Sequence, residues 1–383
     1  MIRHRARLDW WIKQTAVPLE PTPRTRVIAD LVLRDGLNES DIAGLFGSTD
    51  YAPPLLAPEE SALIGNLEGQ DINQPTQPAW VRHEFPDWLE TPLTELFGDR
   101  LEQEMAAHNE PATVDLRVNT FKTSRAKVQA LLQEAGVACE PTSLSPLGLR
   151  LRDHPRVTQS PLYKDGLFEV QDEGSQMAAL LTDARPGMTV IDFCAGAGGK
   201  TLALSNAMVV KGRFNGALWA CDIAEPRLQE LQKRADRNGA ADTILTHVLL
   251  ENDFWIADNA NLADRVLADV PCSGTGTWRR EPEARWRLTP EALQDYVSRQ
   301  QNILSQAARL VKSGGRLVYV TCSILPAENE EQIAWFLENH PAFKAIPVQG
   351  TWKTIPSSSG PALRLSPATS GTDGFFIAIL QRD

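Results

Sequence analysis

The stretch MTVIDFCAGAGGKT, residues 188–201, runs from apolar residues through a glycine-rich turn into a helix-like segment. The apolar part predicts a buried strand, and Gly196, Gly198 and Gly199 let the backbone turn tightly and approach a ligand. The helix that follows presents free N–H groups in its first turn. The stretch therefore predicts a ligand-binding loop at the carboxyl end of the first strand of an α/β sheet.

Strand-like and helix-like segments alternate from about residue 165 onward. Apolar runs such as RVLADVP at 265–271 and GRLVYVTCS at 315–323 alternate with amphipathic segments, the longest of which covers 290–311. This alternation predicts an open, mainly parallel sheet with helices on both faces. Residues 165–383 are thus expected to form one domain, with its ligand site beyond the carboxyl ends of the strands.

Two smaller regions precede this domain. Residues 1–75 carry apolar residues at three- and four-residue spacing, which predicts a helical N-terminal region. The polar stretch EGQDINQPTQPAWV at 68–81 is expected to be a linker. Residues 76–164 mix helical patterns with short alternating runs such as TVDLRVNTF at 113–121, which predicts a small α+β module.

The composition is that of a folded globular protein, with 42% hydrophobic and 23% charged residues. We expect a cytoplasmic protein without membrane contact, because no signal peptide is evident and no apolar stretch approaches the ~20 residues of a membrane span. The five cysteines are an odd number without a CxxC pair, so we expect reduced thiols and no metal site.

The net charge of −11 argues against a broad basic surface for nucleic acid. Residues 277–287, TWRREPEARWR, nevertheless concentrate four arginines and two tryptophans, a combination that suits phosphates and stacked bases. The alternative is a solvated loop in which two glutamates offset half of the positive charge. Both interpretations remain open from the sequence.

Three ligands compete for the glycine-rich loop. A P-loop needs glycine where Cys194 stands, and a dinucleotide fingerprint needs its third glycine where Thr201 stands. S-adenosylmethionine remains, because it needs close backbone approach but has no pyrophosphate. Asp222, which ends the next strand, is placed to accept hydrogen bonds from both ribose hydroxyls, although NAD would use the same acid.

Cys272 and Cys322 each follow an apolar strand, beside the predicted ligand loop. Free cysteine is often a small buried hydrophobe, which suits Cys139, Cys194 and Cys221. Two thiols at neighbouring strand ends indicate a catalytic role instead.

One reaction uses two such thiols. A thiolate that adds to carbon 6 of cytosine makes carbon 5 able to take a methyl group from a sulfonium donor. The adduct must then lose the carbon-5 proton and expel the thiolate, and a second ionisable group can assist. Asp269 is placed either to bond the N3/N4 edge of the base or to be an ordinary strand-end carboxylate. These residues alone do not rank the two cysteines.

Six stretches carry a family resemblance: QDEGSQMAALL (171–181), DFCAGAGGKT (192–201), CDIAEPRL (221–228), ADVPCSGTGTWRREPEARW (268–286), GGRLVYVTCSILPAENEEQI (314–333) and GTDGFFIA (371–378). Together they resemble the RNA cytosine-5 methyltransferases of the Sun/Fmu type, bacterial relatives of which modify small-subunit ribosomal RNA. Residues 116–137 are similar to the small RNA-binding module of that family.

The resemblance implies a Rossmann-like S-adenosylmethionine methyltransferase domain with a small α+β RNA-binding module and an N-terminal helical region. It makes Cys322 the nucleophile, Cys272 the group that assists release, and Asp269 the acid beside the base. The cofactor residues that it implies are Cys194, Ala195, Gly196, Ala197, Gly198, Gly199, Lys200, Asp222, Arg227 and Asp269, with Glu251 or Asp253 near the adenine.

The chain departs from the family at the loop, whose usual form is CAAPGGKT. Gly196 and Ala197 replace a rigid residue with a flexible pair, and we expect cofactor binding to be retained. The implied activity is S-adenosylmethionine-dependent methylation of cytosine carbon 5 in RNA, with ribosomal RNA as the expected partner of a monomeric enzyme. The alternatives are methylation of tRNA or another RNA, and a non-catalytic RNA-binding factor in ribosome assembly.

Overall fold

The computed structural model describes residues 1–16, 19–47, 49, 51–153, 155–250, 254–348 and 361–383. Contacts between Cα atoms divide them into two compact units. The first unit combines Met1–Glu110 with Glu281–Arg287, and the second combines Pro111–Arg280 with Leu288–Asp383. The domain boundaries expected at residues 75 and 164 remain predictions.

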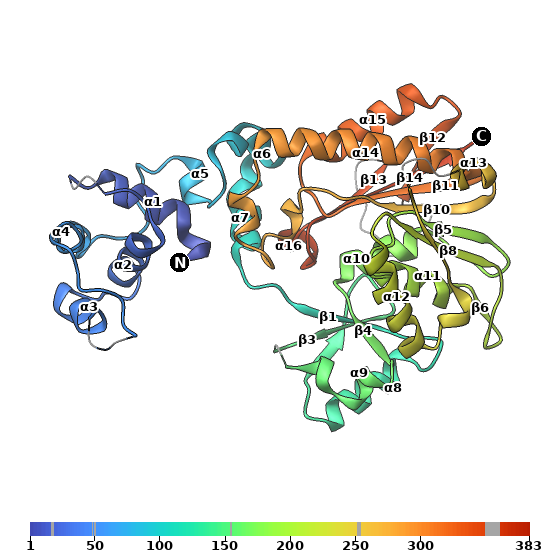
Figure 1. Ribbon diagram of the computed structural model, residues 1–383, viewed down its shortest axis with the longest axis horizontal. Helices are drawn as coiled ribbons and strands as arrows, with labels where there is room; N and C mark the ends of the chain where they lie inside the picture. Colours follow the sequence, from blue (N-terminus) through green and yellow to red (C-terminus); the bar gives the residue numbers. More distant parts are fainter. Residues whose placement is uncertain (17–18, 48, 50, 154, 251–253, 349–360) are drawn as a thin grey trace. The chain divides into compact units, whose positions relative to one another are not determined.

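The first unit is helical, which confirms the expected N-terminal helical region (Figure 1). Helix α2 begins with a reciprocal cap, in which the Thr22 hydroxyl accepts from the Thr25 amide and the Thr25 hydroxyl accepts from the Thr22 amide. Leu8, Ile28 and Leu63, on three different helices, are fully buried in one core. The helices are α1 (Arg5–Gln14), α2 (Pro23–Leu33), α3 (Glu39–Leu45), α4 (Pro58–Leu67), α5 (Ala79–Arg82), α6 (Glu90–Phe97) and α7 (Leu101–Asn109).

The stretch at residues 68–81 is not the linker that the sequence predicts. The indole Nε1 of Trp11 donates to the Ile72 carbonyl at 3.2 Å, and Arg7 donates to the side chain of Asn73 at 2.5 Å. Gln77 is buried. Polar and proline-rich composition was a poor guide here, because these polar groups are satisfied by packing against α1.

A small antiparallel sheet opens the second unit, in the order β2-β3-β1-β4. Val128 and Leu132 of α8 are buried in the same core as the sheet residues, which confirms the expected small α+β module. The elements are β1 (Val114–Val118), α8 (Arg125–Glu134), β2 (Cys139–Pro141), β3 (Gly148–Leu151), α9 (Pro161–Lys164) and β4 (Phe168–Val170).

A large sheet forms the rest of the second unit. Neighbouring strands from β9 to β11 are parallel, whereas β14 is antiparallel to β11, β12 and β13. The mainly parallel sheet is therefore confirmed, with an antiparallel edge that the sequence pattern did not reveal. Its order is β12 (Phe343–Ile346), β14 (Phe375–Arg382), β11 (Val311–Thr321), β10 (Ala263–Asp269), β5 (Thr189–Asp192), β8 (Ala217–Asp222) and β9 (Leu245–Val248), with β13 (Ala362–Leu365) beside β14.

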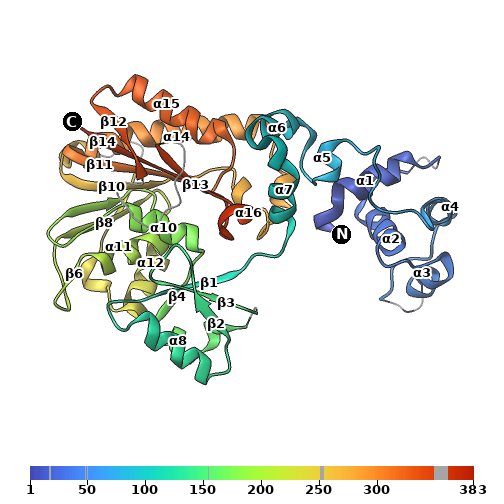
Figure 2. The same ribbon diagram turned by 180° about the vertical axis from the view of Figure 1, so that it is seen from behind.

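Helices cover both faces of the large sheet (Figures 1 and 2). Successive residues of β5 show the alternation, because Val190 packs with the helices of one face and Ile191 with those of the other. One face carries α10 (Glu173–Leu181), α11 (Gly199–Ala207) and α12 (Glu225–Asn238), and the other carries α13 (Trp255–Asp258), α14 (Pro290–Leu310) and α15 (Glu330–Asn339). The remaining elements are the hairpin β6 (Val209–Val210) and β7 (Arg213–Phe214), and α16 (Pro367–Ser370).

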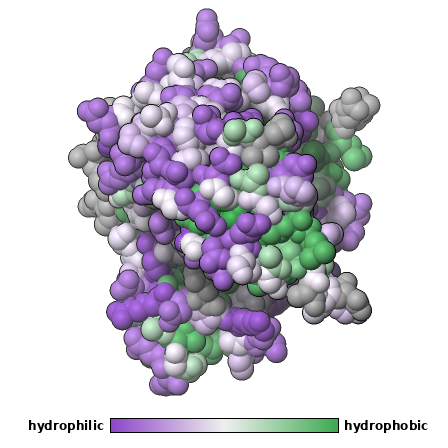
Figure 3. Space-filling view, turned by 90° about the vertical axis from the view of Figure 1, so that its left-hand side faces the viewer, coloured by the Kyte–Doolittle hydropathy of each residue, from purple (hydrophilic) through white to green (hydrophobic). Residues whose placement is uncertain are grey.

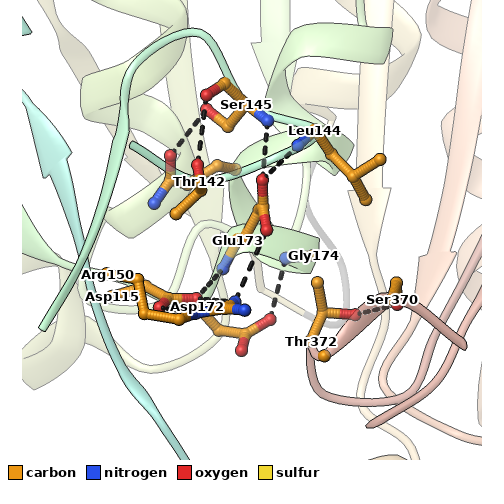
Figure 4. A network of polar contacts seen from close by, with 12 residues as sticks. Asp115, Thr142, Leu144, Ser145, Arg150, Asp172, Glu173, Gly174, Ser370 and Thr372 are labelled. Carbon is orange, nitrogen blue, oxygen red and sulfur yellow. Dashed lines mark hydrogen bonds and ion pairs between the residues drawn. The ribbon is translucent and has the colours of Figure 1, made fainter. Parts of the chain in front are cut away.

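A buried polar network fastens the small sheet to α10 (Figure 4). The Glu173 carboxylate accepts from the amides of Leu144 and Ser145 at 2.5 and 2.8 Å, and Arg150 lies 3.4 Å from its other oxygen. Arg150 also donates to Asp115 at 2.7 Å. Because these charges are paired and hydrogen-bonded, their burial is compatible with a stable junction.

The outer surface is mostly hydrophilic in the view of Figure 3, with hydrophobic areas between polar ones. In the first unit the large apolar side chains that stay exposed include Leu45, Tyr51 and Leu55. Within the described part of the chain, no helix has the length and apolar character needed to cross a membrane.

Candidate active site

The glycine-rich loop connects β5 to α11. Gly196 and Gly198 have φ values of 54° and 82°, in the left-handed region that favours glycine. A Cβ atom on Gly198 would also overlap the Leu231 side chain. The Asp222 carboxylate accepts from the Gly196 amide at 2.8 Å and, through its other oxygen, from the Ala224 amide at 2.8 Å. The acid at the tip of β8 therefore shapes the loop directly.

A cavity of about 1190 Å³ lies at the carboxyl ends of β5, β8, β10 and β11. Gly198 is absent from its lining and packs against Leu231 instead, and Glu251 and Asp253 lie outside the described residues. The structure brings all the other predicted site residues to this cavity: Cys194, Ala195, Gly196, Ala197, Gly199, Lys200, Asp222, Arg227, Asp269, Cys272 and Cys322.

The lining fits S-adenosylmethionine. A carboxylate offers about four acceptor positions, and Asp222 uses two of them on backbone amides, which leaves capacity for ribose hydroxyls. Ile223, Leu249 and Leu250 supply apolar surface beside this acid. The N-terminus of α11 offers free N–H groups to a carboxylate, as anions require. Arg227, the residue predicted to face the cofactor, lies over Gly196.

The two cysteines lie at the tips of neighbouring parallel strands. Asp269 of β10 pairs in register with Val320 of β11, and the Sγ atoms of Cys272 and Cys322 are 3.3 Å apart. The hydrogen bond with Cys322 and burial raise the pKa of the Cys272 thiol well above its ordinary value. Cys272 therefore carries little thiolate at neutral pH, and a thiol without thiolate is a poor nucleophile.

One buried carboxylate holds both cysteine loops. Glu328, in the short 3-10 helix Pro326–Glu328, accepts from the hydroxyls of Ser273 and Ser323, both at 2.5 Å. It also accepts from the Ser273 amide at 2.8 Å and from Gln300 at 2.9 Å. Ser273 and Ser323 each directly follow a site cysteine. Glu328 thus fixes the two loops relative to each other, a role that sequence reasoning missed.

Three loops meet behind Cys322. The Gly276 amide donates to the Cys322 carbonyl at 2.9 Å, and the Gly374 amide donates to the Gly276 carbonyl at 2.8 Å. A Cβ atom on Gly276 would overlap the Gly374 carbonyl. Close backbone approach therefore accounts for glycine in both the GTG and GTDG stretches.

Lys200 and Asp269 form an ion pair inside the cavity, with Nζ 2.5 Å from Oδ2. Burial by itself lowers the pKa of Lys200, but the attraction of Asp269 outweighs it and the pKa is raised. The ammonium group is therefore charged at neutral pH. The predicted contact of Asp269 with the edge of a base remains a prediction.

The arginines that follow Cys272 have structural roles. Arg279 is buried and donates to Asp373 at 2.5 Å, and it also pairs with Asp172 at 3.3 Å. Arg280 binds the same two acids. These pairings with aspartates distant in the sequence give both arginines a structural role, and contact of this segment with RNA phosphates stays a prediction.

Two further residues of the segment 277–287 are also buried. Arg285 is buried and donates to the carbonyls of Glu84 and His108 at 2.7 and 3.2 Å. Trp278 is buried as well, so it offers no surface for stacking. Arg287 is the arginine of this segment whose side chain is largely exposed, at 69%.

Comparisons with known proteins agree on one family. Residues 179–381 match the family model described as 16S rRNA methyltransferase RsmB/F, and residues 85–158 match the ferredoxin-like domain of RsmF/B-like methyltransferases. A probable ribosomal RNA small subunit methyltransferase B of Synechocystis sp. is 37% identical over 367 residues, which is 93% of this chain and 79% of that protein. The corresponding methyltransferase B of Vibrio cholerae is 30% identical over 88% of this chain and 75% of its own length.

Two solved structures from Pyrococcus horikoshii share the fold of this chain. A methyltransferase homologue from Pyrococcus horikoshii superposes with a TM-score of 0.68 at 27% identity, over 79% of this chain and 97% of its own. NSun6 from the same organism, solved with the ligand SFG, shares the fold at 19% identity and a TM-score of 0.68. Methyltransferases of this family depend on S-adenosylmethionine, which confirms the predicted cofactor. The chain belongs to the RsmB/F family of 16S rRNA methyltransferases.

Proposed function

We propose that this protein transfers a methyl group from S-adenosylmethionine to carbon 5 of a cytosine in small-subunit ribosomal RNA. The observation that carries the proposal is the pair of thiols, 3.3 Å apart, in the same cavity as the glycine-rich loop and Asp222. A methyltransferase that acts on a nucleophilic oxygen or nitrogen needs no such pair. A pyrimidine carbon needs covalent activation, which one thiol supplies and the other helps to reverse.

Cys322 is the attacking group. Its thiol passes a proton to water, and the thiolate forms a bond from Sγ to carbon 6 of the cytosine. The electron pair of the bond between carbons 5 and 6 shifts toward carbon 5, which makes that carbon nucleophilic. Cys272 has a raised pKa and stays protonated, and once Cys322 is a thiolate the S–H of Cys272 donates a hydrogen bond to its sulfur. The ion pair of Lys200 and Asp269 faces the same space, where it stabilises the charge that develops on the N3/N4 edge of the base.

S-adenosylmethionine held at the glycine-rich loop and Asp222 would supply the methyl group that the activated carbon 5 takes. The carbon-5 proton then passes to water, and its electron pair restores the double bond between carbons 5 and 6. The bond between carbon 6 and Cys322 breaks, and Cys322 leaves as a thiolate. The S–H group of Cys272 stabilises that leaving thiolate, which is how it assists release.

The test is transfer of a labelled methyl group to defined RNAs. The full chain is incubated with labelled S-adenosylmethionine and, separately, with 16S ribosomal RNA, small ribosomal subunits and tRNA, and the modified nucleotide is mapped. We expect 5-methylcytosine in the ribosomal RNA. Exclusive labelling of tRNA would support the tRNA alternative, and cofactor binding without transfer to any RNA would support an assembly factor.

A matched pair of variants ties the activity to the site. Asp222→Ala removes an acid of the cavity lining, whereas Cys139→Ala removes a buried cysteine of the small sheet. We expect the first to abolish transfer at limiting cofactor and the second to leave it unchanged. Equal activity of the two variants would contradict the assignment of the cofactor to this cavity.

A further inference from the structure

Two arginine side chains hold carbonyl groups of the glycine-rich loop. Arg117 Nη1 donates to the Gly199 carbonyl at 2.5 Å, and Arg234 Nη1 donates to the Ala197 carbonyl at 2.6 Å. Arg117 comes from β1 of the small sheet, and Arg234 comes from α12. Neither arginine lies on a strand of the large sheet.

The small sheet controls both contacts. Arg117 on β1 and Glu169 on β4 are direct cross-strand partners. Arg117 reaches the loop by itself, and the Glu169 carboxylate accepts from Arg234 Nη2 at 2.8 Å, so it orients the second arginine. Asn238, near the end of α12, donates to the same carboxylate at 2.5 Å. Arg117 and Glu169, which are neighbours in the small sheet, therefore make both connections between that sheet and the glycine-rich loop.

This arrangement is costly to bury. Arg117 and Glu169 are 1% and 2% exposed, and two guanidinium nitrogens of Arg117, Nε and Nη2, have no hydrogen-bond partner among the described residues. Burial lowers the pKa of Arg117 to about 10, so the side chain is still a cation at neutral pH. A junction selected for stability alone would be better served by apolar residues, because buried ion pairs seldom repay their desolvation.

The contact between Arg117 and the Gly199 carbonyl orients the peptide unit that joins Gly199 to Lys200. A peptide unit is planar and trans, so its C=O and N–H groups point in opposite directions. When Arg117 holds the Gly199 carbonyl on one side, the amide of Lys200 is directed to the other. Arg117 also donates to Gln171 at 2.9 Å, and Gln171 lines the cavity beside Gly199 and Lys200.

We propose that Arg117 and the Glu169–Arg234 pair are positioning residues that hold the glycine-rich loop in its cofactor-binding shape. The small module thus serves cofactor binding as well as any contact with RNA. The inference rests on the placement of the cofactor at this loop, which belongs to the proposed function. It predicts a defect in affinity for S-adenosylmethionine when Arg117 or Glu169 is changed, although neither residue lines the cavity; Arg234 does line it.

The test compares variants of the full chain by calorimetric titration with S-adenosylmethionine. Arg117→Met keeps the volume and removes the donors, and Arg234→Met does the same on α12. The matched control is Arg125→Met on α8, which loses one bond to the Ser145 carbonyl in the same module. We expect Arg117→Met to raise the Kd for cofactor about tenfold and Arg125→Met to change it less than about twofold.

Two further readouts separate positioning from general stability. Methyl transfer at saturating cofactor should stay within about threefold of wild type, and Arg117→Lys should recover part of the affinity. A folded Arg117→Met variant with wild-type cofactor affinity would overturn the proposal. If that variant does not fold, an unchanged Kd in Arg234→Met, whose side chain is 19% exposed, would overturn it.

Failure of the proposed function gives a different result. If Asp222→Ala leaves the Kd for S-adenosylmethionine unchanged, the cofactor does not bind at this loop, and that outcome overturns the placement on which the inference rests. If Asp222→Ala weakens binding and both arginine variants do not, the cofactor site stands and the positioning role is wrong.

Discussion

The sulfur atoms of Cys272 and Cys322 lie 3.3 Å apart at the tips of adjacent parallel strands. At this distance the two thiols are hydrogen-bonded, and that bond together with burial raises the pKa of Cys272. Their separation depends on more than the strands, because Glu328 binds the serine that follows each cysteine. The reactivity of the site therefore belongs to the pair and to the carboxylate that supports it.

Glu328→Gln should impair catalysis without affecting cofactor binding. Glutamine cannot accept from both serine hydroxyls and the Ser273 amide as a carboxylate does, so the two cysteine loops lose their common anchor. We predict a fall in kcat of about 10²-fold, as a small misplacement of reacting groups produces. The Kd for S-adenosylmethionine should not change, because Glu328 does not line the cavity.

The same substitution changes the titration of Cys272. The negative charge of Glu328 is one cause of the raised pKa of Cys272, after the hydrogen bond with Cys322 and burial, so its removal lowers that pKa. In a Cys322→Ala background, alkylation of Cys272 should therefore begin at lower pH when Glu328→Gln is added. The control is Glu330→Gln, whose side chain is 51% exposed. Identical pH profiles for the two double variants would contradict the electrostatic effect of Glu328 on Cys272.

Arg279→Met should destabilise the fold rather than weaken RNA binding. The change removes a cation that binds the buried side chains of Asp373 and Asp172, although Arg280 keeps a contact with each. Breaking a buried ion pair by removing one partner costs about 3–5 kcal/mol, and the remaining arginine places the expected loss of unfolding free energy at the lower end. Urea denaturation measures it.

Arg287→Met provides the comparison within the same segment. Its exposed side chain lies 4.0 Å from Glu283, at the limit of an ion pair, so the expected change in unfolding free energy is within about 0.5 kcal/mol. A normal urea midpoint for Arg279→Met, together with a reduced salt dependence of RNA binding, would show that Arg279 contacts phosphate and would contradict the structural role.

The parts of the site that lie close together in the sequence were predictable. The apolar run that ends at Asp192, the glycines after it and the acid at the end of the next strand form a local pattern, and the structure joins Gly196 to Asp222. The meeting of Cys272 and Cys322 was predictable for a related reason. Parallel strands that are neighbours end at the same edge, so residues that follow two such strands lie near each other.

Contacts between distant residues were beyond reach of the sequence pattern. Charge spacing around Arg279 gave no sign of Asp373, and a strand residue such as Arg117 gave no sign that it would reach Gly199. In the sequence, Glu328 is one of three glutamates within residues 328–331, and nothing in their spacing singles it out. Each of these groups acquires its role only when tertiary packing brings it to a partner, and burial then makes the pairing obligatory.

The most direct test is the fate of the covalent complex with RNA in two single-cysteine variants. Protein, S-adenosylmethionine and substrate RNA are incubated and separated under denaturing conditions, with Cys139→Ala as the control. Cys322→Ala should form no adduct, because the attacking sulfur is gone. Cys272→Ala should accumulate the adduct, because release loses its assisting thiol. Accumulation in Cys322→Ala and none in Cys272→Ala would contradict the assignment of the two roles.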